Sequence, residues 1–358
     1  MEPPGTGGVE TLADPSWKPE DFDPIEAPSV DGPRVDALPG STDSGNPHPG
    51  DALYDAGYQT IARLQEARSE LLDAVMGGLS FLGDEPFFLL LIPILYWTVD
   101  RAMALRLTVL LMASTWLNGA AKALVDLPRP SPDRVEVLRE YASGGVPSGH
   151  AQNAVVVWGY LASLRPAGLP LPMAAGAAIA LALGIGVSRL YLGVHFPHDL
   201  LAGWLLGGLL LWGALRYRGP AEAWLASQAK REGGWILLGL VVLIPLLMLV
   251  LYREHEALPA ATALLGAGLG AVWERRHLGF QAQGTGVQLA ARIGLGLAVA
   301  AAIWMGLRAP LAPWGDPGRI LRYVLLGAWV TGGAPWLFLR LRLASSVSGP
   351  SAPPDPPR

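Results

Sequence analysis

Long apolar blocks separated by short polar breaks dominate the chain between about residues 84 and 340. An α-helix needs about 20 mostly apolar residues to cross the ~30 Å hydrocarbon core of a bilayer. The blocks that approach this length predict nine membrane-spanning helices, at residues 84–99, 103–124, 148–164, 171–190, 199–216, 234–252, 258–273, 287–307 and 320–339. Helices of a large soluble bundle are seldom so uniformly apolar. The pattern therefore predicts an all-α fold, a polytopic transmembrane helical bundle.

The pattern changes on both sides of these blocks. Residues 53–82 place apolar side chains at helical spacing but carry too many charges for a span, which predicts an interfacial amphipathic helix. If that segment crosses the membrane, the count becomes ten. Both ends of the chain are rich in proline and poor in large apolar residues, so we expect disordered tails there.

These features predict five regions along the chain. They are an acidic Pro-rich tail (1–52), the amphipathic helix (53–82), a core of the first five spans (83–218), a four-span C-terminal extension (219–343) and a second tail (344–358).

The composition agrees with a membrane protein. Of 358 residues, 51% are hydrophobic and 16% are charged, against about 25% charged in soluble domains. The net charge of −4 is unevenly distributed. Positions 1–60 hold twelve acidic and two basic residues, whereas the rest of the chain holds eighteen acidic and twenty-four basic residues. The basic residues are scattered singly, so a nucleic-acid partner is not expected. The chain contains no cysteine, which excludes disulfides, thiolate metal sites and a cysteine nucleophile.

The basic residues also predict an orientation. One set of alternate loops holds eleven Lys or Arg and the other holds six, once the motif residues described next are set aside. Loops rich in Lys and Arg stay in the cytoplasm. We therefore expect the C-terminus inside and, with nine spans, the N-terminal tail outside.

Three polar clusters at span ends are not explained by membrane anchoring. The first is Lys122 with Arg129, the second is the run 147–150 (Pro-Ser-Gly-His), and the third joins Arg189, His195 and Asp199. Two helices of about 20 residues and a turn separate the two histidines, so the clusters should meet on one face. By the loop charges, that face is extracytoplasmic.

These residue types together suit phosphoryl transfer. The cations Lys122, Arg129 and Arg189 can surround phosphate oxygens, and Ser148 with the Gly149 N–H offers donors at a helix N-terminus. His195, oriented by Asp199 four positions later, is a candidate nucleophile, and His150 can protonate the leaving oxygen. No cage of carboxylates is visible for a metal, so the cations would neutralise the charge. His198 lies beside Asp199 but outside the pattern, and we assign it no role.

The three clusters fit the pattern KxxxxxxRP…PSGH…SRxxxxxHxxxD without a departure. In this respect residues 84–216 resemble the type 2 phosphatidic acid phosphatase superfamily, which also contains glucose-6-phosphatases and vanadium haloperoxidases. The resemblance implies that His195 forms a phosphohistidine, that Asp199 is its partner and that His150 is the acid. It implies phosphate binding by Lys122, Arg129, Ser148, Gly149, His150 and Arg189, with no metal and no cofactor.

The resemblance implies an integral membrane phosphatase acting on a lipid phosphomonoester or diphosphate at the extracytoplasmic face. Alternatives are a lipid phosphotransferase with an alcohol acceptor, a sugar phosphatase of glucose-6-phosphatase type, and a transporter or scaffold that only binds phosphate lipids. Asp199 stands where glucose-6-phosphatases carry Gln, which disfavours a sugar phosphate. The expected partners are the substrate and membrane lipids, and the expected location is a bacterial inner membrane. The oligomeric state stays open.

Overall fold

The computed structural model describes residues 49–139, 141, 143–165, 168–230 and 235–346. The two predicted tails lie almost wholly outside these residues. The chain divides into a small unit, Met1–Asn46 with Glu140–Ala142, and a large unit, Pro47–Arg139 with Ser143–Arg358. Every helix named below belongs to the large unit.

Helices make up the described part of the chain, apart from loops and one isolated β-bridge between Phe280 and Ser346. The α-helices are α1 (Pro49–Gln65), α2 (Glu70–Phe81), α3 (Glu85–Thr98), α4 (Arg101–Val125), α5 (Gly149–Ser163), α6 (Leu171–Tyr191), α7 (Pro197–Lys230), α8 (Trp235–Leu251), α9 (Ala257–His277), α10 (Gly286–Ala301), α11 (Arg308–Leu311), α12 (Asp316–Ala328) and α13 (Ala334–Arg340). Short helices of other types are η4 (Ala302–Gly306, π), η5 (Ala312–Trp314, 3₁₀) and η6 (Trp329–Gly333, π). The predicted helical fold class is confirmed.

Five helices among the described residues are long and apolar enough to cross a membrane: Arg101–Val125, Leu171–Tyr191, Pro197–Gln228, Ala257–His277 and Gly286–Trp314. The helices α2 and α3 pass the same test together but meet at 55°, which gives up to six. Helix α8 is apolar but shorter, and α5 has only 15 residues. The count of nine spans therefore stays a prediction.

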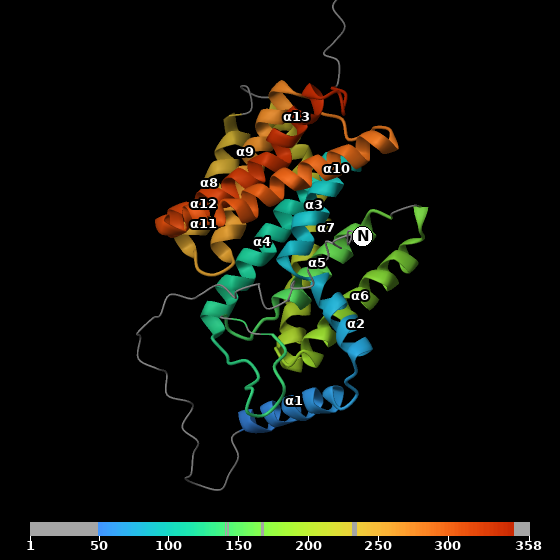
Figure 1. Ribbon diagram of the computed structural model, residues 1–358, viewed down its shortest axis with the longest axis vertical. Coiled ribbons are helices and arrows are strands. Elements are labelled where there is room, and N and C mark those ends of the chain that lie inside the picture. Colours follow the sequence, from blue (N-terminus) through green and yellow to red (C-terminus); the bar gives the residue numbers. More distant parts are fainter. Residues whose placement is uncertain (1–48, 140, 142, 166–167, 231–234, 347–358) are drawn as a thin grey trace, which may run out of the picture. The chain divides into compact units, whose positions relative to one another are not determined.

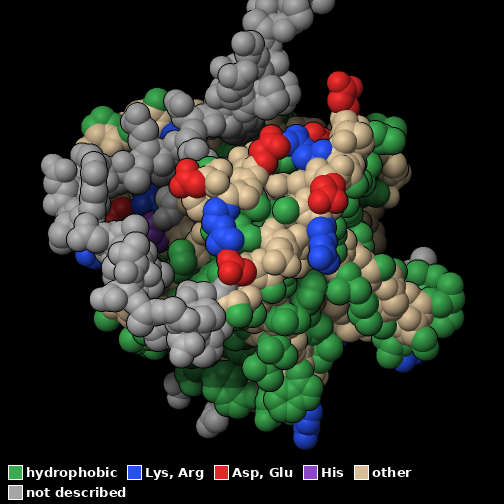
Figure 2. All heavy atoms as spheres, turned by 90° about the horizontal axis from the view of Figure 1, so that it is seen from below, with side chains coloured by type: hydrophobic (Ala, Val, Ile, Leu, Met, Phe, Trp, Pro, Cys, Tyr) green, Lys and Arg blue, Asp and Glu red, His purple; other side chains and the backbone are tan. Residues whose placement is uncertain are grey.

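The segment predicted as one amphipathic helix, 53–82, contains parts of two helices. Helix α1 ends at Gln65, and Ser69 begins α2 by accepting a hydrogen bond from the Leu72 N–H at 3.2 Å. In Figure 1, α1 lies below the teal loop that leaves α4. Figure 2 looks onto this side and shows acidic and basic side chains grouped on one part of it, with hydrophobic side chains around them.

Helices α4 to α7 form the core that carries the predicted motifs, with α5 packed against α4, α6 and α7. The approach of α7 to α5 is close enough to require glycine. A Cβ at Gly203 would lie 2.5 Å from the Ser148 carbonyl oxygen, and one at Gly207 would lie 2.6 Å from that of Gln152. Small residues of this kind let helix backbones approach one another in lipid.

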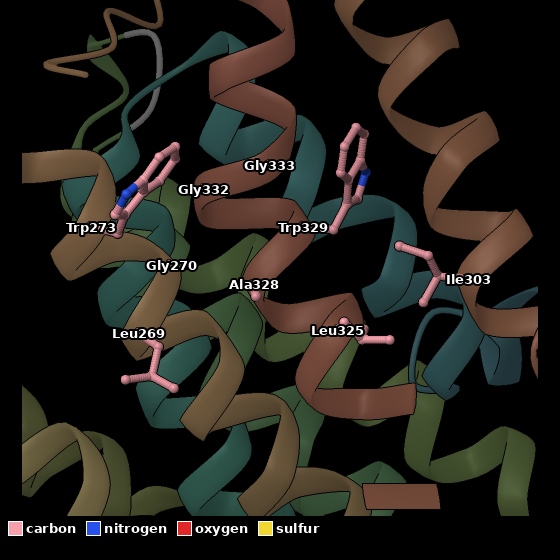
Figure 3. Close-up of a pocket in the computed structure, with 9 residues that line it drawn as sticks. All are labelled: Leu269, Gly270, Trp273, Ile303, Leu325, Ala328, Trp329, Gly332 and Gly333. Atoms are coloured by element: carbon pink, nitrogen blue, oxygen red, sulfur yellow. The ribbon is translucent and has the colours of Figure 1, made fainter. Parts of the chain in front are cut away.

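The C-terminal helices pack on the core mainly through α9, which contacts α4 and α12. An open apolar groove of about 560 Å³ lies on this part of the chain (Figure 3). It is lined by Leu269, Gly270, Trp273, Ile303, Leu325, Ala328, Trp329, Gly332 and Gly333. These residues come from α9, η4, α12 and η6, and none belongs to the predicted motifs.

Arg292 on α10 is fully buried and ties several loops together. Its guanidinium donates hydrogen bonds to the carbonyl oxygens of Leu343 at 2.9 Å, Trp97 at 3.0 Å, Ala282 at 2.5 Å and Gln283 at 2.9 Å. A buried carbonyl that loses its donor costs about 1–3 kcal/mol. This side chain therefore joins the end of α3 to the segment before α10 and to the segment after α13.

We expect Arg292→Met to lower the free energy of unfolding by at least about 2 kcal/mol, because the two buried carbonyls of Trp97 and Ala282 lose a donor together. Thermal unfolding of the purified protein in detergent, followed by tryptophan fluorescence, measures the change. The exposed Arg275→Met is the control and should leave the midpoint unchanged. Equal midpoints for the two variants would contradict this role.

Candidate active site

The predicted motif residues lie at helix ends on one side of the core. Lys122 is in the last turn of α4, and Arg189 is in the last turn of α6. Ser148 immediately precedes α5, whose first residues are Gly149 and His150. His195 lies in the loop before α7, and Asp199 is in the first turn of α7.

The His195 imidazole is oriented by Asp199. Its Nδ1 lies 2.9 Å from Asp199 Oδ2, and both side chains are buried. The same oxygen accepts the Phe196 backbone N–H at 2.9 Å. Because a carboxylate fixes Nδ1 as the protonated nitrogen of a neutral imidazole, Nε2 carries the lone pair that can act as nucleophile.

Arg129 lies directly beside that nitrogen, with Nη1 3.1 Å from His195 Nε2. The guanidinium is held in place because it also donates to the carbonyl oxygens of Val194 at 2.9 Å and Ser143 at 2.7 Å. A fixed cation next to the nucleophilic atom is placed to bind an anion that this atom attacks.

Lys122 approaches the same place from α4. Its Nζ donates to Ser143 Oγ at 2.9 Å, and Arg129 Nη2 lies 3.4 Å from the same hydroxyl. The hydroxyl of Ser143 thus lies between two of the predicted phosphate-binding cations. Ser143 lies in the loop outside the three motifs, so no sequence pattern points to it.

The pKa of His195 is lowered well below its usual value, first by burial and then by the positive charges of Arg129, Arg189 and Lys122. All three predicted cations therefore act on the imidazole. Lowering its pKa keeps His195 neutral, which is the form required of a nucleophile.

The start of α5 faces the same region. The Ser148 backbone N–H donates to the Asp199 carbonyl oxygen at 3.0 Å. Its hydroxyl is buried and has no hydrogen-bond partner among the described residues. A Cβ at Gly149 would lie 3.0 Å from Asn118 Oδ1, so glycine allows this close approach. A helix N-terminus with these donors favours an anion.

His150 lies close to a carboxylate that belongs to none of the three sequence motifs. Its Nε2 is 2.6 Å from Oδ1 of Asp84, which lies between α2 and α3. The other oxygen of Asp84 accepts from Arg139 Nη1 at 2.9 Å. Arg189, the third predicted cation, is fully buried and donates to the hydroxyl of Ser80 on α2.

His198, which was assigned no role, lies against the site. Its Nε2 is 3.1 Å from Asp199 Oδ1, and its ring stacks on Phe196 with centroids 5.3 Å apart. Helix α1 adds Tyr54 and Tyr58, whose rings meet Phe196 edge-on at 5.1 and 5.0 Å. The loop that carries His195 is thus packed against α1.

A row of polar side chains within α4 and α5 leads up to the site. Asn118 Nδ2 donates to the Pro147 carbonyl oxygen at 3.2 Å and to Gln152 Oε1 at 2.8 Å. Gln152 Nε2 donates to Ser114 Oγ at 2.9 Å, and this hydroxyl donates to Asn153 Oδ1 at 2.7 Å. These bonds hold the segment before α5 against α4.

In the part of the chain that the structure describes, no three His, Asp or Glu side chains converge as a metal site would require. The positive charge close to His195 comes from Lys122, Arg129 and Arg189.

Two family models match this chain. Residues 103–222 match the PAP2 superfamily, and residues 258–346 match the transmembrane extension of PAP2 superfamily phosphatases. The first match contains all the predicted site residues, and the second covers most of the C-terminal helices, to which the sequence analysis assigned no chemistry. Together with the apolar helices, these matches identify an integral membrane protein.

Two curated relatives illustrate the similarity. Lipid phosphate phosphatase delta of Arabidopsis thaliana is 27% identical over 241 residues, covering 62% of this chain and 57% of the plant protein. The chain thus spans little more than half the length of that relative. Phosphatidylglycerophosphatase B of Bacillus subtilis (strain 168) is 32% identical over 152 residues, covering 40% of this chain and 73% of the bacterial protein.

Among solved structures, a transmembrane PAP2 type phosphatidylglycerolphosphate phosphatase from Bacillus subtilis aligns with 48% of this chain and 88% of its own. The sequence identity is 28% and the TM-score is 0.42. Three observations lead to one conclusion: the motifs, the two regions matched by family models, and the 73% of phosphatidylglycerophosphatase B that this chain covers at 32% identity. This chain belongs to the PAP2 superfamily, the type 2 phosphatidic acid phosphatases that its three motifs resemble.

Proposed function

We propose that this protein is an integral membrane phosphatase that hydrolyses a phosphomonoester or diphosphate of a lipid through a phosphohistidine. The observation that carries the proposal is the His195 imidazole, held by Asp199 at Nδ1 and placed beside Arg129 at Nε2. Binding alone needs cations but no oriented nucleophile, so this pair favours an enzyme over a transporter or scaffold.

The first step transfers the phosphoryl group to the protein. His195 Nε2 attacks phosphorus, and the bond between phosphorus and the lipid oxygen breaks. His150 gives a proton to the departing oxygen. Lys122, Arg129 and Arg189 stabilise the charge on the phosphoryl oxygens, together with the N–H donors at the start of α5, so the reaction proceeds without a metal.

The second step releases phosphate. Water attacks the phosphohistidine, His150 takes its proton, and the bond between phosphorus and Nε2 breaks to restore neutral His195. An alcohol in place of water would give a phosphotransferase with the same residues. A search for phosphorylated alcohol in the products separates the two acceptors.

A lipid is the substrate class that this placement favours. The site lies at the ends of membrane helices, and two relatives carry names that refer to a lipid phosphate and a phosphatidylglycerophosphate. The charge bias of the loops supports an extracytoplasmic site. The bacterial relative and the Ala-, Gly- and Leu-rich spans favour a bacterial inner membrane.

We expect His195→Ala to lower phosphate release from phosphatidic acid by at least ~10³-fold, because the nucleophile is lost. Protein incubated with ³²P-labelled substrate and then denatured in alkali should carry label in the wild type, lost on later acid treatment, and none in the variant. The exposed His277→Ala is the matched control. Retained turnover in His195→Ala would contradict a histidine nucleophile at this position.

The lowered pKa of His195 predicts a pH profile. An ordinary histidine is half protonated near about pH 6.5, so the rate of phosphohistidine formation should stay constant as the pH falls through that value. It should decline only at lower pH, where His195 gains a proton. Removing one cation in Arg129→Gln should move this decline toward neutral pH. A wild-type rate that halves near about pH 6.5 would contradict the lowered pKa.

The sidedness of the site can be tested with single cysteines, since the chain contains none. Asp133 is exposed in the loop between α4 and α5, whereas Arg275 lies at the far end of α9, next to Glu274, which pairs with Arg101 at 2.6 Å. In intact cells an impermeant maleimide should label Asp133→Cys, and it should label Arg275→Cys only after permeabilisation. The reverse result would place the site in the cytoplasm.

A further inference from the structure

We propose that Asp84 is a positioning residue that orients His150 so that protons enter and leave this histidine at Nδ1. The inference rests on the proposed phosphatase function. Asp84 belongs to none of the three motifs, yet its Oδ1 lies 2.6 Å from His150 Nε2.

The geometry shows which edge of the imidazole faces Asp84. A Cβ built at Gly83 would lie 3.0 Å from His150 Cδ2, the ring atom next to Nε2. The edge formed by Cδ2 and Nε2 therefore faces the turn at residues 83 and 84. In an imidazole ring Nδ1 lies on the opposite edge, so Nδ1 is turned away from this carboxylate.

Asp84 is itself fixed from two sides. It directly precedes α3, where the chain bends by 55° after α2. Its second oxygen accepts from Arg139 Nη1 at 2.9 Å, and only 17% of its side chain is exposed. A carboxylate that faces an imidazole on one oxygen and a guanidinium on the other has little freedom to rotate.

Each of the two histidines is thus paired with its own carboxylate, through opposite ring nitrogens. Asp199 holds Nδ1 of His195, which leaves Nε2 for attack on phosphorus. Asp84 holds Nε2 of His150, and we assign proton transfer to Nδ1 on the opposite edge of the ring. The difference matches the two roles, since one histidine forms a bond to phosphorus and the other exchanges a proton.

The proton balance follows from this pairing. In the proposed step the negative charges of Asp84 and of the bound phosphate together stabilise the doubly protonated imidazole of His150, whose Nε2–H stays with the carboxylate. When the bond between phosphorus and the lipid oxygen breaks, the Nδ1 proton moves to that oxygen. In the second step Nδ1 takes a proton from the attacking water, and His150 returns to its starting form.

A change of leaving group tests this role, because a poor leaving group needs the proton and a good one does not. We expect Asp84→Asn to slow turnover of phosphatidic acid by about 100-fold, and turnover of 4-nitrophenyl phosphate by less than about threefold. His150→Ala should show the same selectivity. The turnover rate of the double variant should lie within about threefold of the rate of His150→Ala, since Asp84 acts through that histidine.

Asp55→Asn is the matched control. Like Asp84, Asp55 pairs with an arginine of the loop after α4, since its Oδ1 lies 2.7 Å from Arg134 Nη2. Among the described residues it forms no such pair with a histidine. It should leave both rates unchanged. Asp84→Glu keeps the charge and should recover at least about tenfold over Asp84→Asn with phosphatidic acid.

Equal losses of both substrates in Asp84→Asn, or no recovery in Asp84→Glu, would overturn the positioning role while leaving the proposed function intact. No phosphate release by the wild type from either substrate would overturn the proposed function itself.

Discussion

The buried carboxylate of Asp199 connects the parts of the candidate active site. Its Oδ2 accepts N–H groups from His195 and Phe196, and its backbone carbonyl accepts the N–H of Ser148. A buried carboxylate needs such donors, and at the start of α7 it also complements the helix dipole. The proposed nucleophile and the N-terminal end of α5 therefore share one anchor. Glycine at position 145 allows a close approach here, since a Cβ would lie 2.8 Å from the Pro128 carbonyl oxygen and 3.2 Å from the Asp199 carboxylate.

The positions of the motif residues could be predicted because helices of known rise return the chain to the same membrane face. Lys122, Ser148 and Arg189 lie at helix ends for this reason. Asp84 and Ser143 could not be found in this way. No period or motif relates Asp84 to His150, which is 66 positions away, and their contact depends on the bend between α2 and α3. Hydropathy also could not predict the number of spans, because it counts apolar residues without showing where a helix bends or ends.

The C-terminal helices support the core rather than adding groups to the site. The Trp116 indole on α4 donates to the carbonyl oxygens of Met248 and Tyr252, and the Tyr323 hydroxyl bonds with Glu85 at the start of α3. One turn before Lys122, a Cβ at Gly119 would lie 3.2 Å from the Tyr252 ring. The helix that presents Lys122 is thus backed by the extension, which explains how a region without motif residues can matter for the geometry of phosphate binding.

The polar row shared by α4 and α5 bears on how the protein is assembled. With 15 residues, α5 is about 22 Å long, and it brings His150, Gln152 and Asn153 into a region where lipid offers no hydrogen bonds. Its partners Ser114 and Asn118 stand on the preceding helix. During synthesis, α4 emerges first with these groups in place. We therefore expect α5 to enter the bilayer as the second half of a hairpin with α4, so that the residues lining the site also guide membrane insertion.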